Sequence, residues 1–177
     1  NNPEDSTTLS DNTITTFCRD FEDPENILWV GTNNGLNRFD KRIGRVRRIL
    51  RADGLPGGNI LSLAFDKRGR LWIGTSRGLS RFNTQTHEFR HYTVDDGIQG
   101  DESGLYGLCL TSSGEMFYGG TGGLTIFYPD SIRDNPHAPP VVFTDFKVTN
   151  KSVVPGVPGS PLTRTITETK EITLSYL

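Results

Sequence analysis

The sequence predicts an all-β protein made of repeated units, and two observations support this prediction. A twelve-residue phrase occurs three times, as LWVGTNNGLNRF at 28–39, LWIGTSRGLSRF at 71–82 and MFYGGTGGLTIF at 116–127. A period of more than forty residues, with no helical spacing of apolar residues, indicates a unit that stacks against copies of itself. The composition agrees, because 20 glycines can form turns and the 10% of aromatic residues favour strands.

The middle repeat divides into four short strands. We expect them at Ile60–Phe65, Leu71–Gly74, Leu79–Phe82 and Glu88–Thr93, because polar and glycine-containing turns separate these apolar segments. Asp66–Gly69 is typical of such a turn, with glycine where a positive φ is wanted. Four antiparallel strands in about 45 residues form one blade of a β-propeller.

Residues 1–128 are therefore expected to form three four-stranded blades, at about 9–52, 55–94 and 98–128. The first strand of each blade is rich in small residues and should lie nearest the axis. Trp29, Trp72 and Phe117 on the second strands should fill the space between sheets. A propeller ring holds about 4–8 blades. We therefore expect further blades upstream in a longer parent, or association of copies as the alternative.

The pattern changes after Phe127. Residues 129–140 contain four prolines and predict a stiff junction. Residues 141–177 then predict strands at 141–148, 163–169 and 171–177, the start of a second, immunoglobulin-like β-sandwich. The chain begins NNPEDSTT and stops in the strand-like run ITLSYL, so we expect it to be a piece of a longer polypeptide. It contains no run of about 18 apolar residues and no secretion signal.

The phrases LWVGTNNGLNRFD and LWIGTSRGLSRFN, together with the link Asp53-Gly54-Leu55, resemble the two-component regulator propeller repeat. The third copy and the residues after it look like the last blade of such a propeller running into a Y-Y-Y domain. EITLSYL resembles an early strand of that sandwich domain. In this family the propeller and the sandwich form the extracytoplasmic sensor of a membrane-bound histidine kinase, and many members respond to oligosaccharides.

The resemblance implies a non-catalytic sensor fragment, placed on the periplasmic side of a bacterial membrane protein whose kinase lies elsewhere in the parent. Its expected partners are an oligosaccharide or similar small ligand and a second copy of the parent ectodomain, and no cofactor is implied. A net charge of −2 gives no field that would attract nucleic acid, and we expect no direct membrane insertion. A protein-interaction scaffold and a polysaccharide-degrading propeller enzyme remain alternatives.

Three short motifs invite other functions, and simpler interpretations are available for each. HEFRH at 87–91 matches HExxH, but zinc binding needs a helix, whereas an extended strand would put the two histidines about 13 Å apart. Asp95, Asp96, Asp101 and Glu102 lack the ligand spacing of an EF-hand and are typical of turns. The glycine-rich stretch 119–123 predicts a strand–turn–strand corner rather than a phosphate loop.

A basic stretch and two cysteines complete the candidate chemistry. Six cations lie between Lys41 and Arg51, which we interpret as a charged outer strand, with an anion-binding patch as the alternative. Cys18 and Cys109 occupy equivalent repeat positions. They are expected to be two buried thiols, because a disulfide needs Cα atoms within about 7 Å.

Propeller topology gives the candidate ligand site. The links between blades and the turns between second and third strands should meet on one face around the axis. Asparagine, aspartate and arginine there offer planar hydrogen-bonding groups that suit sugar hydroxyls. The expected ligand-binding residues, none of them catalytic or metal-binding, are Asn33, Asn34, Asn59, Ser76, Arg77, Asp101 and Glu102.

Overall fold

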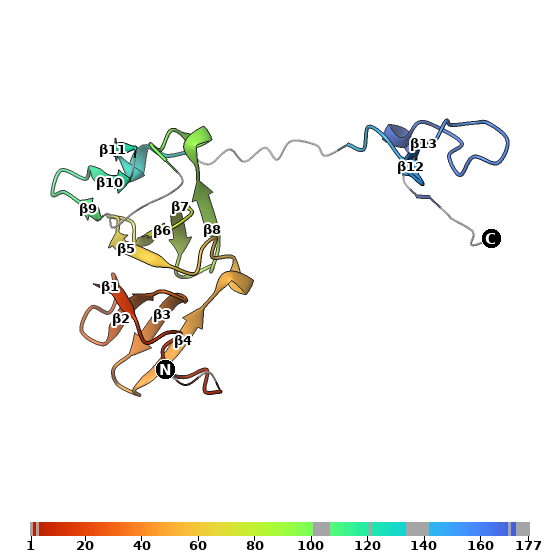
Figure 1. Cartoon of the computed structure of the whole chain (residues 1–177). Helices are drawn as coiled ribbons and strands as arrows, with labels where there is room; N and C mark the ends of the chain where they lie inside the picture. Colours follow the sequence, from red (N-terminus) through yellow and green to blue (C-terminus); the bar gives the residue numbers. More distant parts are fainter. Residues whose placement is uncertain are drawn as a thin grey trace. The chain divides into compact units, whose positions relative to one another are not determined.

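The computed structural model describes residues 2, 4–100, 107–120, 122–133, 142–169 and 171–172. The chain divides into two compact units, Asn1–Arg133 and Asp134–Leu177. Regular structure in the described part consists of strands and short 3-10 turns (Figure 1). None of these turns has the length or apolar character of a membrane-spanning helix.

The first two repeats form matching four-stranded antiparallel sheets in which neighbours in sequence are neighbours in space. The strands are β1 (Ile14–Arg19), β2 (Ile27–Thr32), β3 (Gly35–Asp40), β4 (Arg45–Ile49), β5 (Ile60–Phe65), β6 (Arg70–Thr75), β7 (Gly78–Asn83) and β8 (Phe89–Tyr92). Trp29 faces Arg38 across one sheet, and Trp72 faces Arg81 at the same position of the other. The strands predicted for the middle repeat are thus confirmed, with ends shifted by about a residue.

The third repeat forms only three strands in the described residues: β9 (Leu108–Leu110), β10 (Met116–Gly120) and β11 (Gly123–Phe127). The expected four-stranded blade is wrong here, because after β11 the chain enters the 3-10 turn η3 (Pro129–Ser131). Pro129 is buried, and its carbonyl accepts a hydrogen bond from Arg70 Nη2 at 3.0 Å. Asp130 pairs with Arg68 at 2.8 Å. These contacts hold the chain against the second sheet instead of along β11.

The inner strands of the three sheets lie next to one another, β1 beside β5 and β5 beside β9 (Figure 1). The core fills the spaces between sheets. Trp29 meets Phe82 of the second sheet edge-on, with ring centroids 6.0 Å apart. Trp72 lies between Tyr92, at 5.3 Å, and Phe127 of the third sheet, at 5.0 Å. The two tryptophans therefore occupy the space predicted for them, as expected for propeller blades.

A carboxylate accepts a hydrogen bond from the indole N–H of each tryptophan. Asp66 is 1% exposed, and its Oδ2 accepts hydrogen bonds from Trp72 Nε1 at 2.9 Å and Arg70 Nε at 2.7 Å. In the first repeat Asp20 accepts from Trp29 Nε1 at 2.6 Å. The third repeat has Thr111 and Phe117 at these two positions. The acid is thus present only where an indole N–H needs an acceptor, because a buried donor without a partner is costly.

The second unit contains little regular structure in its described residues. These form a short hairpin whose strands have two residues each, β12 (Lys147–Val148) and β13 (Lys151–Ser152), and the 3-10 turn η4 (Ile166–Glu168). The strand expected at 141–148 is therefore confirmed only at Lys147–Val148 and is wrong over 142–146, and the strand expected at 163–169 is wrong. Phe143 is 71% exposed, and among the described residues no larger sheet pairs with the hairpin, so an extended segment here has no ladder to join. Most of the strand expected at 171–177 lies outside the described residues.

Candidate functional site

The β2–β3 turn, the β6–β7 turn and the first link, between β4 and β5, lie at one end of the first unit, which we call the loop face. Gly35 N, at the β2–β3 turn, donates to Gly58 O in the first link at 2.7 Å. Ser76 N, at the β6–β7 turn, donates to Asn59 O in the same link at 3.4 Å. The turns of adjacent sheets therefore share one link, as the topology argument predicted.

The links begin in two equivalent 3-10 turns, η1 (Arg51–Asp53) and η2 (Val94–Asp96). In each turn the last aspartate accepts a hydrogen bond from the backbone N–H three residues earlier, at 2.8 and 3.0 Å. A glycine follows each turn with φ of 102° and 94°, a conformation that other residues rarely adopt. The turn role expected for Asp96 is thus confirmed, and both links begin in the same hydrogen-bonded turn.

Five of the predicted ligand-binding residues lie on the loop face. Asn33, Asn34, Ser76 and Arg77 are exposed at the two turns, and Asn59 lies in the link between them. Asn59 Oδ1 is buried and has no hydrogen-bond partner among the described residues. The structure therefore brings these five together. The other two, Asp101 and Glu102, lie outside the described residues.

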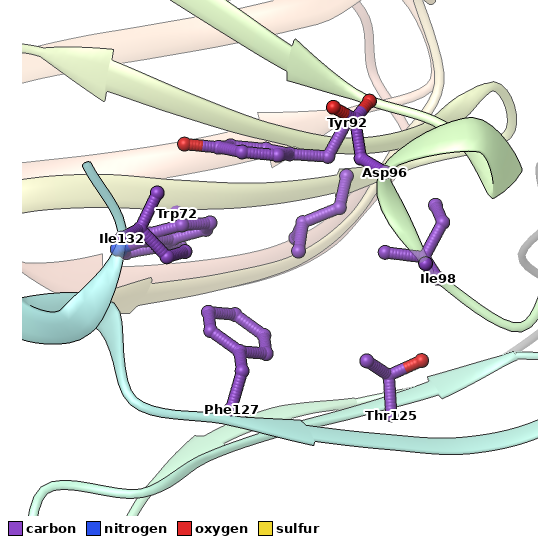
Figure 2. Close-up of a pocket in the computed structure, with 9 residues that line it drawn as sticks. Trp72, Tyr92, Asp96, Ile98, Thr125, Phe127 and Ile132 are labelled. Carbon is purple, nitrogen blue, oxygen red and sulfur yellow. The ribbon is translucent and has the colours of Figure 1, made fainter. Parts of the chain in front are cut away.

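A small apolar cavity of about 70 Å³ lies between the second and third sheets (Figure 2). Trp72, Tyr92 and Phe127 form its aromatic walls, and Asp96 lies at its edge. A water molecule occupies roughly 30 Å³ in the liquid, so this cavity suits an apolar group of only a few atoms. Sequence reasoning missed it, because its walls come from two repeats. Aromatic residues on both β8 and β11 were the available signal.

The HExxH segment is not helical, as expected. His87 lies in the turn before β8 with φ of 62°, and His91 lies on β8 itself. His91 Nδ1 is 3.0 Å from Ser80 Oγ, and burial lowers the pKa of this imidazole. In the described part of the chain no three histidine, cysteine or acidic side chains are grouped to hold a metal ion.

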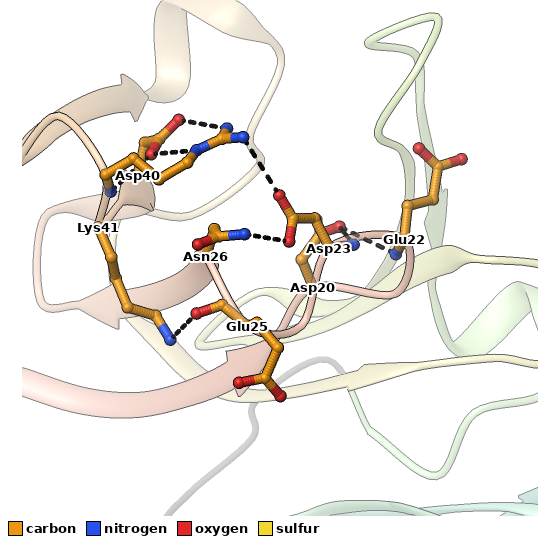
Figure 3. A network of polar contacts seen from close by, with 8 residues as sticks. Asp20, Glu22, Asp23, Glu25, Asn26, Asp40 and Lys41 are labelled. Carbon is orange, nitrogen blue, oxygen red and sulfur yellow. Dashed lines mark hydrogen bonds and ion pairs between the residues drawn. The ribbon is translucent and has the colours of Figure 1, made fainter.

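Two cations of the basic stretch take part in a polar network at the end opposite the loop face (Figure 3). Lys41 Nζ donates to Glu25 O at 2.5 Å. Arg42 pairs with Asp40 at 2.8 Å and lies 3.6 Å from Asp23. The hydrogen bond from Arg42 lowers the pKa of Asp40 to about 2. Lys41 and Arg42 are therefore occupied by contacts within the first blade.

The two cysteines differ, although their repeat positions are equivalent. Both are free, Cys18 is half-buried, and burial raises the pKa of its thiol. Cys109 is exposed, so the expectation of two buried thiols is wrong for this residue. The reason is that the second sheet packs over the face of the first sheet that holds Cys18, whereas the corresponding face of the third sheet is open.

Comparison with known proteins agrees with this architecture. The family model described as "Two component regulator propeller" matches residues 8–34 and 54–77. A histidine kinase P4 of Formosa agariphila is 41% identical over 61 residues, which are 34% of this chain and 4% of the kinase. The chain thus spans a small part of that relative.

Solved structures share the fold. The extracellular domain of the hybrid two-component system BT3049 from B. thetaiotaomicron matches with a TM-score of 0.65 and 24% identity, over 83% of this chain and 21% of that domain. The extracellular domain of BT4673 from the same organism matches with a TM-score of 0.55 and 18% identity, over 67% of this chain and 16% of that domain. PorZ, a surface component of the type-IX secretion system of Porphyromonas gingivalis, matches with a TM-score of 0.51 and 16% identity, over 67% of this chain and 18% of PorZ. The chain therefore contains two-component regulator propeller repeats, and its fold resembles that of extracellular domains of hybrid two-component systems.

Proposed function

We propose that this chain is part of the extracytoplasmic sensor region of a two-component histidine kinase and binds a small ligand, such as an oligosaccharide, across the loop face. The propeller repeats and the similarity to a histidine kinase support the sensor role. The observation that carries the binding site is the grouping of exposed polar turns around the first link.

The loop face has the chemistry that a sugar requires. Asn33, Asn34 and Arg77 offer amide and guanidinium groups that hydrogen-bond hydroxyls in a plane. Asn59, in the link between the two turns, adds a further amide group beside them. The first link begins in a hydrogen-bonded turn and bonds the β2–β3 and β6–β7 turns through its backbone, so a ligand there would meet a pre-formed surface and lose little affinity to loop ordering.

Transmission of the signal follows from the same proposal. Residues 141–177 would be the start of a Y-Y-Y-type sandwich that follows the last blade, and two parent ectodomains would pair as a homodimer. A ligand can shift such an assembly only by binding one arrangement more tightly than another. The loop face would supply that difference, because its turns and links come from more than one blade.

Calorimetry with a panel of neutral and acidic oligosaccharides tests the proposal. Arg77→Ala should weaken the binding of any oligosaccharide that the panel identifies as a ligand about tenfold, since a hydrogen bond to a charged group is worth roughly 1.5–3 kcal/mol. Arg42→Ala is the matched control, because Arg42 is an exposed turn arginine at the opposite end. Equal loss in both variants would contradict a loop-face site. Turnover of a polysaccharide, abolished by one acid or histidine substitution, would instead establish an enzyme.

A further inference from the structure

The outer side of the groove between the first and second sheets contains a cavity of about 120 Å³. We infer that this cavity is an oxyanion-binding site built on Arg47 and His87, separate from the loop face. Arg47 comes from β4 and His87 from the turn before β8. Ile49, Phe82 and Phe89 form the apolar part of the wall, and the remaining lining residues are Arg48 and Asp53. The volume is about four times the roughly 30 Å³ of one liquid water, enough for a five-atom oxyanion.

The contacts of Arg47 differ from those of its basic neighbours. Lys41 and Arg42 are engaged in the network of Figure 3. Arg48 donates to backbone carbonyls of the N-terminal segment, among them Thr8 O at 2.8 Å. Arg47 Nη1 instead lies 2.8 Å from His87 Nε2, and among the described residues no acidic side chain is paired with Arg47. Its positive charge is therefore held in place without a neutralising carboxylate.

The second sheet shows what a neutralised version of this position looks like. Arg90 is the equivalent of Arg47, since each faces another arginine across its ladder. Arg90 lies 3.7 Å from Asp96 and 5.8 Å from the Tyr92 ring centroid. The corresponding Asp53 is not paired with Arg47, although both line the cavity. Like charges opposite each other destabilise a sheet, so an anion at Arg47 would supply the compensation that Asp96 gives to Arg90.

His87 completes the site in two ways. An arginine can only donate, so Nε2 of this histidine accepts and its ring proton is on Nδ1, which leaves one N–H for a ligand. Its φ of 62° is unusual for a residue other than glycine. That backbone conformation, together with an edge contact to Phe82 at 6.1 Å, holds the imidazole over the groove. A guanidinium, an N–H donor and an apolar wall fit a carboxylate, sulfate or phosphate group.

Titration of the ¹⁵N-labelled chain with sodium sulfate, phosphate and acetate, at ionic strength held constant with chloride, tests the inference. We expect saturable shifts at Arg47, His87 and Phe89 with at least one anion. Preference for sulfate and phosphate over acetate would identify a tetrahedral group, and the reverse a carboxylate. The proposal would be overturned if no anion shifted the signals of these three residues, or if the anions shifted only signals of residues elsewhere in the chain.

Variants distinguish specific anion binding at this cavity from nonspecific attraction by the positive charges of the surface. Arg47→Gln should weaken binding about tenfold or more, and Arg47→Lys should weaken it less, because it keeps the charge and loses the planar fork. His87→Asn should weaken binding severalfold without disturbing the backbone, since asparagine tolerates positive φ. Arg90→Gln is the matched control and should leave binding unchanged. Equal loss in Arg90→Gln and Arg47→Gln would refute the site, and circular dichroism confirms that each variant is folded.

Discussion

The buried Asp66 gives the sharpest test of how a repeat is held together. Substitution by alanine leaves the indole N–H of Trp72, which is fully buried, without its acceptor, at a cost of about 1–3 kcal/mol. It also removes the 2.7 Å ion pair with Arg70, whose side chain is only 17% exposed. Breaking a buried pair costs roughly 3–5 kcal/mol, and Arg70 keeps its bond to Pro129 O. Because Arg70 is partly exposed and keeps that bond, the lower end of each range applies, and we expect Asp66→Ala to lower the free energy of unfolding by about 4 kcal/mol.

Urea unfolding followed by tryptophan fluorescence and circular dichroism measures this loss. Asp20→Ala is the matched control, because Asp20 bonds Trp29 and is not paired with an arginine in the described part of the chain, so a loss of about 1–3 kcal/mol is expected. The third repeat suggests a double variant, Asp66→Thr with Trp72→Phe. Removing the indole N–H together with its acceptor should make the double variant milder than the sum of the singles by about 1–2 kcal/mol. Strict additivity, or equal losses for Asp66→Ala and Asp20→Ala, would refute the reasoning.

Two further predictions concern the links and the polar network. Gly54→Ala should destabilise the chain by about 1–3 kcal/mol, because φ is 102° and a Cβ would lie 3.2 Å from the Phe89 ring. Gly97→Ala should cost about 1 kcal/mol, because its φ is also positive but a Cβ there would meet open space. The midpoints of urea unfolding compare the two variants. Arg42→Gln should raise the pKa of Asp40 from about 2 toward 3.8, measured by NMR titration. Because the folded pKa is depressed, the stabilisation from Asp40 is present above pH 3.8 and disappears as pH falls toward 2. An unchanged Asp40 titration in Arg42→Gln would contradict the assigned cause.

The sequence predicted the strands of the first two repeats because their signals are local. The apolar segment around Trp72 and the glycine turns depend on residues close in the chain, and the structure preserves them. The absence of a fourth strand from the described residues of the third repeat could not be predicted in this way. It depends on Pro129 and Asp130 meeting arginines about sixty residues earlier, a contact that no local pattern encodes.

The candidate site shows the same division. Topology alone placed Asn33, Asn34 and Ser76 on one face, since the ends of a meander are fixed by strand order. The cavity beside Arg47 could not be predicted, because six cations in one stretch look equivalent until their partners are known. Only the structure shows that Arg42 has carboxylate partners and that Arg47 faces an imidazole.

Equivalent positions of the repeats contribute differently to stability, because one face of the third sheet is exposed in the described structure. Leu36 and Leu124 share a letter and a place in the twelve-residue phrase, yet Leu36 is 0% exposed and Leu124 is 53% exposed. Truncating the covered leucine to alanine removes about 2–5 kcal/mol of stability, while the uncovered one has little burial to lose. Identity between repeats is therefore a poor guide to mutational tolerance in this chain, and the neighbouring blade sets the energetic weight of each position.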